Sequence, residues 1–210
     1  MLLTTRQEIP KTVTRHSDAP KMPSPGLEWL WQQLRDIKQP HLLDCGPVRQ
    51  TTLDVYLCRK AKVYIADLVS PAQKGNPKYW DKSKKVPVFL TEEFLGHLPK
   101  IPDGSLAGLF CWHLLDVIPP EAVSRVTERL FSFLQPGGVL FLLLRQPYLP
   151  AGAEALCWLE SLTALQTAQD GKKPFPYPVV TNRDMERLFP AGSVKIFLTR
   201  SGRREVVAMR

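Results

Sequence analysis

The sequence predicts an α/β fold, in which a mostly parallel sheet is covered by helices on both faces. Short, continuously apolar segments alternate along the chain with segments of helical periodicity. Continuous apolar strands are typical of parallel sheets buried on both sides. The last two apolar segments, 194–199 and 205–209, are separated by Ser201 and Gly202, and they predict an antiparallel hairpin at the edge of the sheet.

The N-terminal part of the chain divides into an arm and the start of the domain. Residues 1–25 have no sustained apolar period and contain four prolines, so we expect a flexible arm ahead of a domain spanning residues 26–210. An amphipathic helix is predicted directly after it, because apolar side chains recur there at helical spacing. These side chains are Leu27, Leu30, Trp31 and Leu34.

The remaining elements follow from the same patterns. Pro119 and Pro120 open a helical segment that ends at Pro136-Gly137-Gly138, since proline starts helices and Pro-Gly pairs stop them. Thr181 or Asn182 can cap a later short helix. The predicted strands are 41–46, 63–67, 86–90, 106–112 and 139–144, the other predicted helices are 51–60 and 153–166, and 70–85 is predicted to be a loop.

Composition limits the class of protein. The 210 residues are 44% hydrophobic and 23% charged, with a net charge of +8, which is typical of a globular domain and not of a disordered chain. The four cysteines, Cys45, Cys58, Cys111 and Cys157, lie in apolar stretches without C-x2-C spacing, so we interpret them as buried hydrophobes and expect no metal site and no disulfide framework. The start lacks a signal-peptide core and no apolar run spans a bilayer. We therefore expect a cytoplasmic protein without membrane contact.

The candidate site lies where the predicted strands end, because ligands of open α/β sheets bind at the carboxyl ends of the strands. After the first strand, Asp44, Cys45 and Gly46 combine an acid with a glycine turn before a helix, a pattern that suits an anionic or nucleotide-like ligand. Asp67 ends the second strand 23 residues after Asp44. An acid at this position can accept hydrogen bonds from ribose hydroxyls; alternatively, it caps the following turn.

Several of these segments resemble class I S-adenosylmethionine-dependent methyltransferases. Residues 42–46 (Leu-Leu-Asp-Cys-Gly) resemble the family's first motif, 63–67 the second, 109–118 the fourth-strand segment, and Leu134-Gln-Pro-Gly-Gly138 the helix end before the fifth strand. The resemblance covers about residues 27–210. It implies a Rossmann-like, doubly wound seven-stranded sheet, S-adenosyl-L-methionine as the cofactor, and a small-molecule or macromolecular methyl acceptor.

Two positions in the first loop depart from the pattern of this family. Its first loop usually carries two more glycines, where this chain has Val48 and Gln50, and the Cβ of a β-branched residue narrows the approach of a ligand to the backbone. Arg49 can offset this loss by pairing with the cofactor's carboxylate; alternatively, it is a solvated surface arginine. The departure motivates a second hypothesis, a non-catalytic methyltransferase-fold protein that serves as a binding or assembly module.

The end of the fourth-strand segment supplies the candidate catalytic groups. His113 can take a proton from a nucleophile during methyl transfer, and the carboxylate of Asp116 can orient it. Trp112 can form a wall of the adenine or substrate pocket. The alternative is structural: His113 begins a helical turn, Asp116 caps the next element, and Trp112 belongs to the core.

Two further functions are compatible with parts of the sequence. A nicotinamide-dependent oxidoreductase is disfavoured by the absence of Gly-x-Gly-x-x-Gly and by the terminal hairpin. Nucleic-acid binding is the other, because basic and aromatic residues alternate in residues 74–85 and can contact phosphates and stack on bases; a solvated loop is the competing interpretation. The residues concerned are Lys74, Lys78, Tyr79, Trp80, Lys82, Lys84 and Lys85.

Overall fold

A mixed six-stranded sheet forms the centre of the protein. The computed structural model describes residues 21–47, 49–72, 78–83, 85–145, 155–169, 177–199 and 203–210. Its central strands lie in the order β10-β11-β7-β6-β2-β3; the pairs β3–β2, β2–β6 and β6–β7 are parallel, and β7–β11 and β11–β10 are antiparallel. In chain order these strands are β2 (His41–Asp44), β3 (Lys62–Ile65), β6 (Leu106–Trp112), β7 (Leu134–Arg145), β10 (Val194–Leu198) and β11 (Arg203–Met209).

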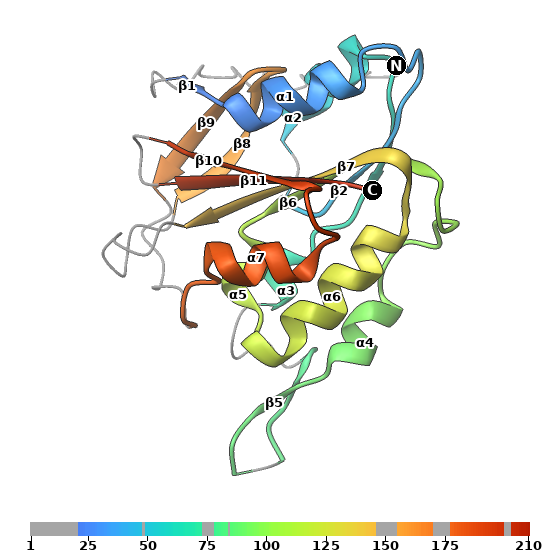
Figure 1. Cartoon of the computed structure of the whole chain (residues 1–210). Coiled ribbons are helices and arrows are strands. Elements are labelled where there is room, and N and C mark those ends of the chain that lie inside the picture. The colour runs from blue at the N-terminus through green and yellow to red at the C-terminus, as the bar shows by residue number, and fades with distance from the viewer. Residues whose placement is uncertain are drawn as a thin grey trace, which may run out of the picture.

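Two layers cover this sheet, as Figure 1 shows. One layer consists of helices α1 and α2 together with a small sheet ordered β1-β9-β8, and the other of α3 to α7. The bounds are β1 (Met22–Pro23), α1 (Pro25–Gln33), α2 (Gln50–Cys58), α3 (Val69–Ala72), α4 (Thr91–Gly96), α5 (Leu114–Val117), α6 (Pro120–Ser132), β8 (Ala155–Ser161), β9 (Ala164–Gln169) and α7 (Asn182–Leu188).

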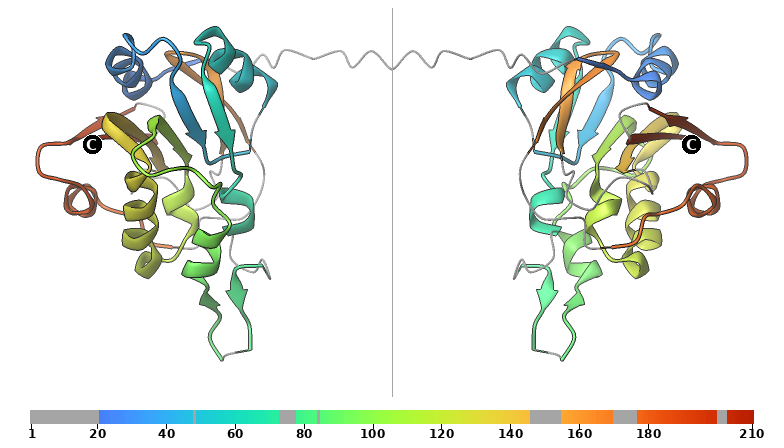
Figure 2. Two further views of the ribbon diagram at one scale, coloured as in Figure 1. Left: turned by 90° about the vertical axis from the view of Figure 1, so that its right-hand side faces the viewer. Right: turned by 90° about the vertical axis from the view of Figure 1, so that its left-hand side faces the viewer.

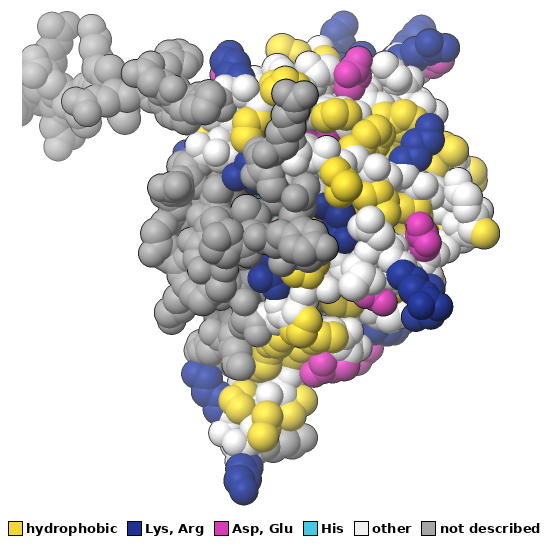
Figure 3. Space-filling view, turned by 60° about the vertical axis from the view of Figure 1, so that its left-hand side comes forward, with side chains coloured by type: hydrophobic (Ala, Val, Ile, Leu, Met, Phe, Trp, Pro, Cys, Tyr) yellow, Lys and Arg dark blue, Asp and Glu magenta, His cyan; other side chains and the backbone are white. Residues whose placement is uncertain are grey.

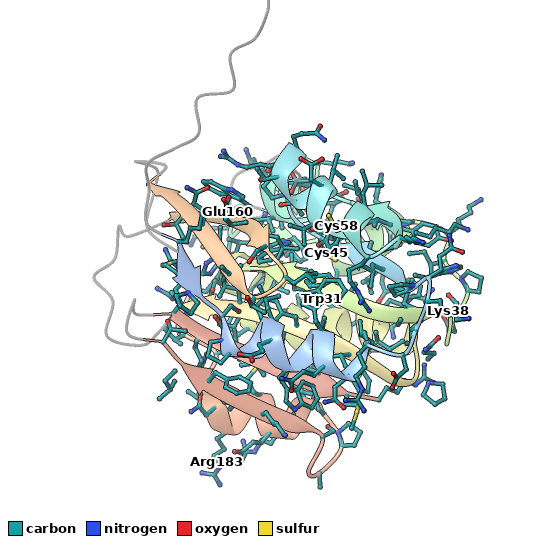
Figure 4. All side chains as sticks on the ribbon, turned by 90° about the horizontal axis from the view of Figure 1, so that it is seen from above. Trp31, Lys38, Cys45, Cys58, Glu160 and Arg183 are labelled. Carbon is teal, nitrogen blue, oxygen red and sulfur yellow. The ribbon has the colours of Figure 1, made fainter. Side chains whose placement is uncertain are left out.

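Each face of the sheet has its own apolar core. Leu30 and Trp31 of α1 pack with Phe110 and Phe141 of the strands on one face, whereas Val126 and Leu130 of α6 belong to the cluster on the other. Figure 4 views the first face from above, with α1 and the β8–β9 pair lying over the strands. The continuous apolar strand β6 is therefore buried on both sides, as the pattern predicts, whereas β3 at the edge of the sheet is half-buried or exposed.

Hydrogen bonds to free backbone amides account for the start of two helices. Ser24 caps α1 by accepting a hydrogen bond from the Leu27 amide, and Glu205 of β11 accepts one from Gly26 at 2.7 Å. A carboxylate at a helix N-terminus is favourable, because the free amides there carry partial positive charge. Thr181 and Asp184 form a reciprocal capping box at the start of α7, which confirms Thr181 as the predicted cap.

The prediction of seven strands in one sheet is wrong for the described residues, which place six strands in the central sheet. The segment expected as the third strand contains β5 (Val88–Phe89), and it pairs with β4 (Trp80–Asp81) in a separate two-stranded ribbon. Figure 2 shows this ribbon as an arm that projects away from the helical layer. A short segment of β-branched and aromatic residues can pair with different strands, because its strand propensity depends on context. Here β5 pairs with β4, which is close to it in the sequence.

The predicted helix over residues 153–166 is also wrong. Residues 155–161 and 164–169 are the antiparallel strands β8 and β9, with Leu162 and Thr163 at the turn. Short apolar segments do not distinguish helix from strand by periodicity. Tertiary contacts decide the outcome, because β9 pairs with β1 and β8 packs on α2.

The described residues begin a few positions before the predicted domain boundary at residue 26. Residues 1–20 lie outside the described residues, but Met22 and Pro23 form β1 and pair with Leu165 and Ala164, so the folded unit includes residues before position 26. Among the described residues, no helix has the length and apolar character needed to cross a membrane.

Candidate functional site

The strand order reverses beside β2, and most of the predicted site residues gather there. The chain passes from β2 to β3 on one side and returns to β6 on the other, which creates the switch point where ligands bind in open α/β sheets. Asp44 at the end of β2 is in register with Ile65 of β3 and Phe110 of β6. The side chains that follow these three strands therefore share one edge of the sheet.

Asp44 is the centre of a buried hydrogen-bond network. Its Oδ1 accepts from the Gly46 amide at 2.9 Å and from Trp112 Nε1 at 2.7 Å, and its Oδ2 accepts from the Tyr56 hydroxyl at 2.6 Å. Burial raises the pKa of Asp44, and these hydrogen bonds lower it in part. Both carboxylate oxygens are engaged within the chain, and the side chain is 1% exposed.

Trp112 lies directly against Gly46. A Cβ placed on this glycine would lie 2.2 Å from Trp112 Cδ1, far inside van der Waals contact, so glycine is required here for the indole to approach the backbone. The close approach that the sequence predicts for a ligand is made by the chain's own tryptophan. Cys45, which precedes Gly46 in the chain, is fully buried. Burial raises the pKa of its thiol, and the neighbouring Cys111 raises this pKa further.

Asp67 and Arg49 lie closer to solvent. Asp67 is exposed, and its Oδ1 accepts from the amides of Val69 and Ser70 at 3.1 and 3.0 Å, so the predicted capping role is present. Among the described residues, none donates a hydrogen bond to Asp67 Oδ2. Arg49 places its guanidinium 3.9 Å from the centre of the Trp158 ring, a cation–π contact that joins the loop after β2 to β8.

His113 occupies an unusual backbone position after β6. Its φ of 55° and ψ of 17° lie in the left-handed region, which costs energy for a residue with a Cβ and is typical of functional or tightly constrained positions. Its Nδ1 lies 2.9 Å from Asp116 Oδ2. Asp116 is buried in α5, also accepts from the Arg145 amide at 3.0 Å, and lies 3.7 Å from Arg145 Nε.

The pKa of His113 is set by its buried contacts. Burial lowers its pKa, but contacts with Asp116 and Cys157 outweigh this effect and raise the pKa to about 9. The imidazole is therefore charged at neutral pH. Cys157 Sγ lies 3.9 Å from His113 Nε2, and sequence analysis missed this contact because nothing in the local pattern joins positions 113 and 157.

This raised pKa predicts a pH-dependent stability. A group whose pKa rises on folding stabilises the protein fully below its unfolded pKa of about 6.5, and that stabilisation is lost as the pH rises through the folded value. We expect the free energy of unfolding of the native chain, relative to His113→Asn, to fall by up to about 1.4 kcal/mol per pH unit between pH 6.5 and 9. Urea titrations at half-unit intervals measure this. If the free energies of unfolding of the two proteins changed equally with pH, this result would contradict the Asp116–His113 pairing.

The aromatic residues of the basic segment are unavailable for base stacking. Tyr79 and Trp80 are 1% and 5% exposed, and both pack in the apolar core near Phe89. Lys78, Lys82 and Lys85 are exposed, whereas Lys74 and Lys84 lie outside the described residues. Figure 3 shows basic and hydrophobic side chains together on the projecting arm. The described residues of this segment therefore expose lysine side chains without exposed aromatic side chains between them.

A surface groove of about 460 Å³ lies between α6, α7 and residues 178–180. Its lining is mainly apolar, and it contains none of the predicted site residues. Its residues are Pro120, Val123, Ser124, Pro178, Val179, Val180, Asp184, Arg187 and Leu188. The described residues show no cluster of His, Cys, Asp or Glu suited to a metal ion.

Comparisons with known proteins found matches among solved structures alone. No family model and no curated protein matches the sequence. Solved structures that resemble the chain include 1,6-didemethyltoxoflavin-N1-methyltransferase from Burkholderia thailandensis, crystallised with S-adenosylhomocysteine, at 14% identity and a TM-score of 0.48, covering 89% of this chain and 76% of that one. A SAM-dependent methyltransferase from Archaeoglobus fulgidus has 14% identity, a TM-score of 0.47 and coverages of 88% and 94%. A SAM-dependent methyltransferase from Aquifex aeolicus has 16% identity and a TM-score of 0.43, and the match covers 89% of each chain.

Proposed function

We propose that the protein is an S-adenosylmethionine-dependent methyltransferase. The observation that carries the proposal is the position of the Asp44–Gly46 turn: it lies at the switch point of a doubly wound sheet, with Asp67 exposed at the end of the adjacent strand. Nucleotide-like ligands bind at this place in such folds. The resemblance of residues 42–46, 63–67 and 134–138 to the methyltransferase motifs supports the same cofactor.

The residues fit this cofactor at one end of the site. Asp67 can accept hydrogen bonds from ribose hydroxyls through Oδ2 while Oδ1 continues to cap α3. At the other end, Trp112 covers Gly46 and Asp44 is saturated with internal donors. Binding at the glycine turn therefore requires the indole of Trp112 to move away from Gly46.

When bound, S-adenosylmethionine supplies an electrophilic methyl group on a sulfonium. The residues of this chain then position the acceptor, and orientation of the two reactants provides much of the rate. His113 is the candidate group to hold or take a proton at Nε2, with Asp116 orienting the ring through Nδ1. Since the pKa of His113 is about 9, we expect any His113-dependent transfer to become faster as the pH rises toward 9.

Calorimetric titration with S-adenosylmethionine and S-adenosylhomocysteine tests the proposal. We expect micromolar binding to the native chain and at least a tenfold loss in both Asp67→Ala and Asp67→Asn. Asparagine keeps the cap of α3 and removes the charged ribose acceptor, so it separates ligand binding from local stability. Trp112→Ala is expected to bind more tightly, because the turn no longer has to expel the indole.

Two results would contradict this assignment. Unchanged affinity in both Asp67 variants would remove the ribose role. Absence of heat with the native chain and with Trp112→Ala would favour the non-catalytic module instead.

A further inference from the structure

Cys157 brings a third chemical group to the His113–Asp116 pair. The thiol projects from β8, a strand that sequence analysis expected to be helix, and its Sγ lies 3.9 Å from His113 Nε2. On the other side of the ring, Nδ1 lies 2.9 Å from Asp116 Oδ2. A thiol, an imidazole and a carboxylate thus follow one another in the order found in nucleophilic catalysis.

The imidazole is held in this position by several independent contacts. The His113 amide donates to the Leu143 carbonyl at 2.9 Å, and the left-handed backbone directs the chain from β6 into α5. Asp116 is fixed in turn by the Arg145 amide. Strain at a residue that the surroundings determine so fully is typical of functional positions. The ring therefore cannot turn away from Cys157 without losing its contact with Asp116 on α5.

The charge on His113 favours a reactive thiol. With a proton on each ring nitrogen, His113 can donate to Asp116 through Nδ1 and direct Nε2–H at Cys157 Sγ. A neighbouring imidazolium stabilises negative charge on sulfur and increases the nucleophilicity of a cysteine. The groups that face the imidazole are Asp116 on α5, Cys157 on β8 and, through Asp116, Arg145 on β7.

The proton on Nε2 indicates which electrophile this arrangement suits. A sulfonium donor departs as a neutral thioether and needs no proton, whereas the thiolate or alkoxide leaving group of an ester does. We propose that Cys157, His113 and Asp116 form a second reactive site that accepts acyl groups from thioesters or activated esters. The proposal shares His113 and Asp116 with the proposed methyl-transfer site, goes beyond that function, and does not require S-adenosylmethionine to bind.

The reaction balances without another reagent. Cys157 Sγ attacks the acyl carbon, a carbon–sulfur bond forms, and the bond to the leaving group breaks. The leaving group departs with the proton from His113 Nε2, which leaves the imidazole neutral. His113 then takes a proton from a water molecule as the water oxygen bonds to the thioester carbon. The carbon–sulfur bond breaks, a carboxylic acid is released, and the Cys157 thiolate and the His113 imidazolium are regenerated.

Acetylation by p-nitrophenyl acetate tests this site in the full chain at pH 7. We expect one acetyl group per molecule on Cys157, identified by peptide mass mapping, and a burst of p-nitrophenolate of equal amount. Exposed Cys58 on α2, labelled in Figure 4, serves as the internal control and should react at least tenfold more slowly. Cys157→Ala should lose the burst, and Cys58→Ser should retain it.

The role of His113 has a separate readout. We expect His113→Asn, with folding verified by its thermal transition, to acetylate Cys157 at least tenfold more slowly. In the native chain, the acetylation rate at Cys157 should depend less on pH between pH 6 and 8 than the rate at Cys58, because Cys157 has an imidazole nitrogen 3.9 Å from its sulfur. Acetylation of Cys58 ahead of Cys157, or equal pH profiles at the two cysteines, would overturn the proposal whether or not S-adenosylmethionine binds.

Discussion

Replacing Asp44 with alanine should destabilise the fold by roughly 4 kcal/mol, because it leaves three buried donors without an acceptor. These donors are the Gly46 amide, the Tyr56 hydroxyl and Trp112 Nε1. Tyr56 is 1% exposed and Trp112 5% exposed, so water cannot readily replace the lost carboxylate. Equilibrium unfolding in urea at pH 7, monitored by tryptophan fluorescence and circular dichroism, measures the change.

Asp44→Asn is the matched control for this prediction. The amide oxygen can still accept from Gly46 and Trp112, and its NH2 group can donate to the Tyr56 oxygen, so most of the network is retained. We expect this variant to lose roughly 1 to 2 kcal/mol, about as much as Tyr56→Phe. Equal and small effects of the alanine and asparagine substitutions would show that the carboxylate is not the centre of the network.

The second large effect is expected at Gly46. A Cβ at this position would lie 2.2 Å from Trp112 Cδ1, so Gly46→Ala must displace the indole and break its hydrogen bond to Asp44. We expect a loss of about 3 kcal/mol in stability, at the upper end for overpacking of a core.

A double-mutant cycle with Trp112 isolates this contact. Trp112→Ala alone should cost about 3 to 5 kcal/mol as a cavity-forming substitution. In its background, Gly46→Ala should cost less than about 1 kcal/mol, since the atom it meets has been removed. Additive effects of the two substitutions would contradict the close packing, and with it the requirement that Trp112 move before a cofactor reaches the turn.

Asp44 and Trp112 thereby connect stability with the proposed function. The same contacts that hold the turn closed occupy the space where a nucleotide-like ligand is expected. A ligand that displaces Trp112 must offset the hydrogen bond and the packing that the indole loses, so weakening this contact should favour binding. The calorimetric comparison of the native chain with Trp112→Ala measures that balance directly.

The sequence alone was sufficient for the elements whose signals are local. The apolar segment of β6 is predicted at residues 106–112 and observed there, and the proline and glycine signals at both ends of α6 locate that helix to within a few residues. Thr181 identifies the start of α7, because a capping side chain bonds to amides of its own helix. The strand-end positions of Asp44, Asp67 and His113 also follow from the chain, since parallel strands bring their carboxyl ends to one edge.

Only the tertiary structure decided the fate of segments and side chains that depend on distant partners. Residues 155–169 became strands because β1 and α2 contact them, and β5 left the central sheet because β4 pairs with it locally. The indole of Trp112 reaches Asp44 across 68 positions in the chain, and Cys157 reaches His113 across 44. Periodicity and capping act within a few residues, whereas a buried contact of this kind exists only after the sheet and its covering layers bring the partners together.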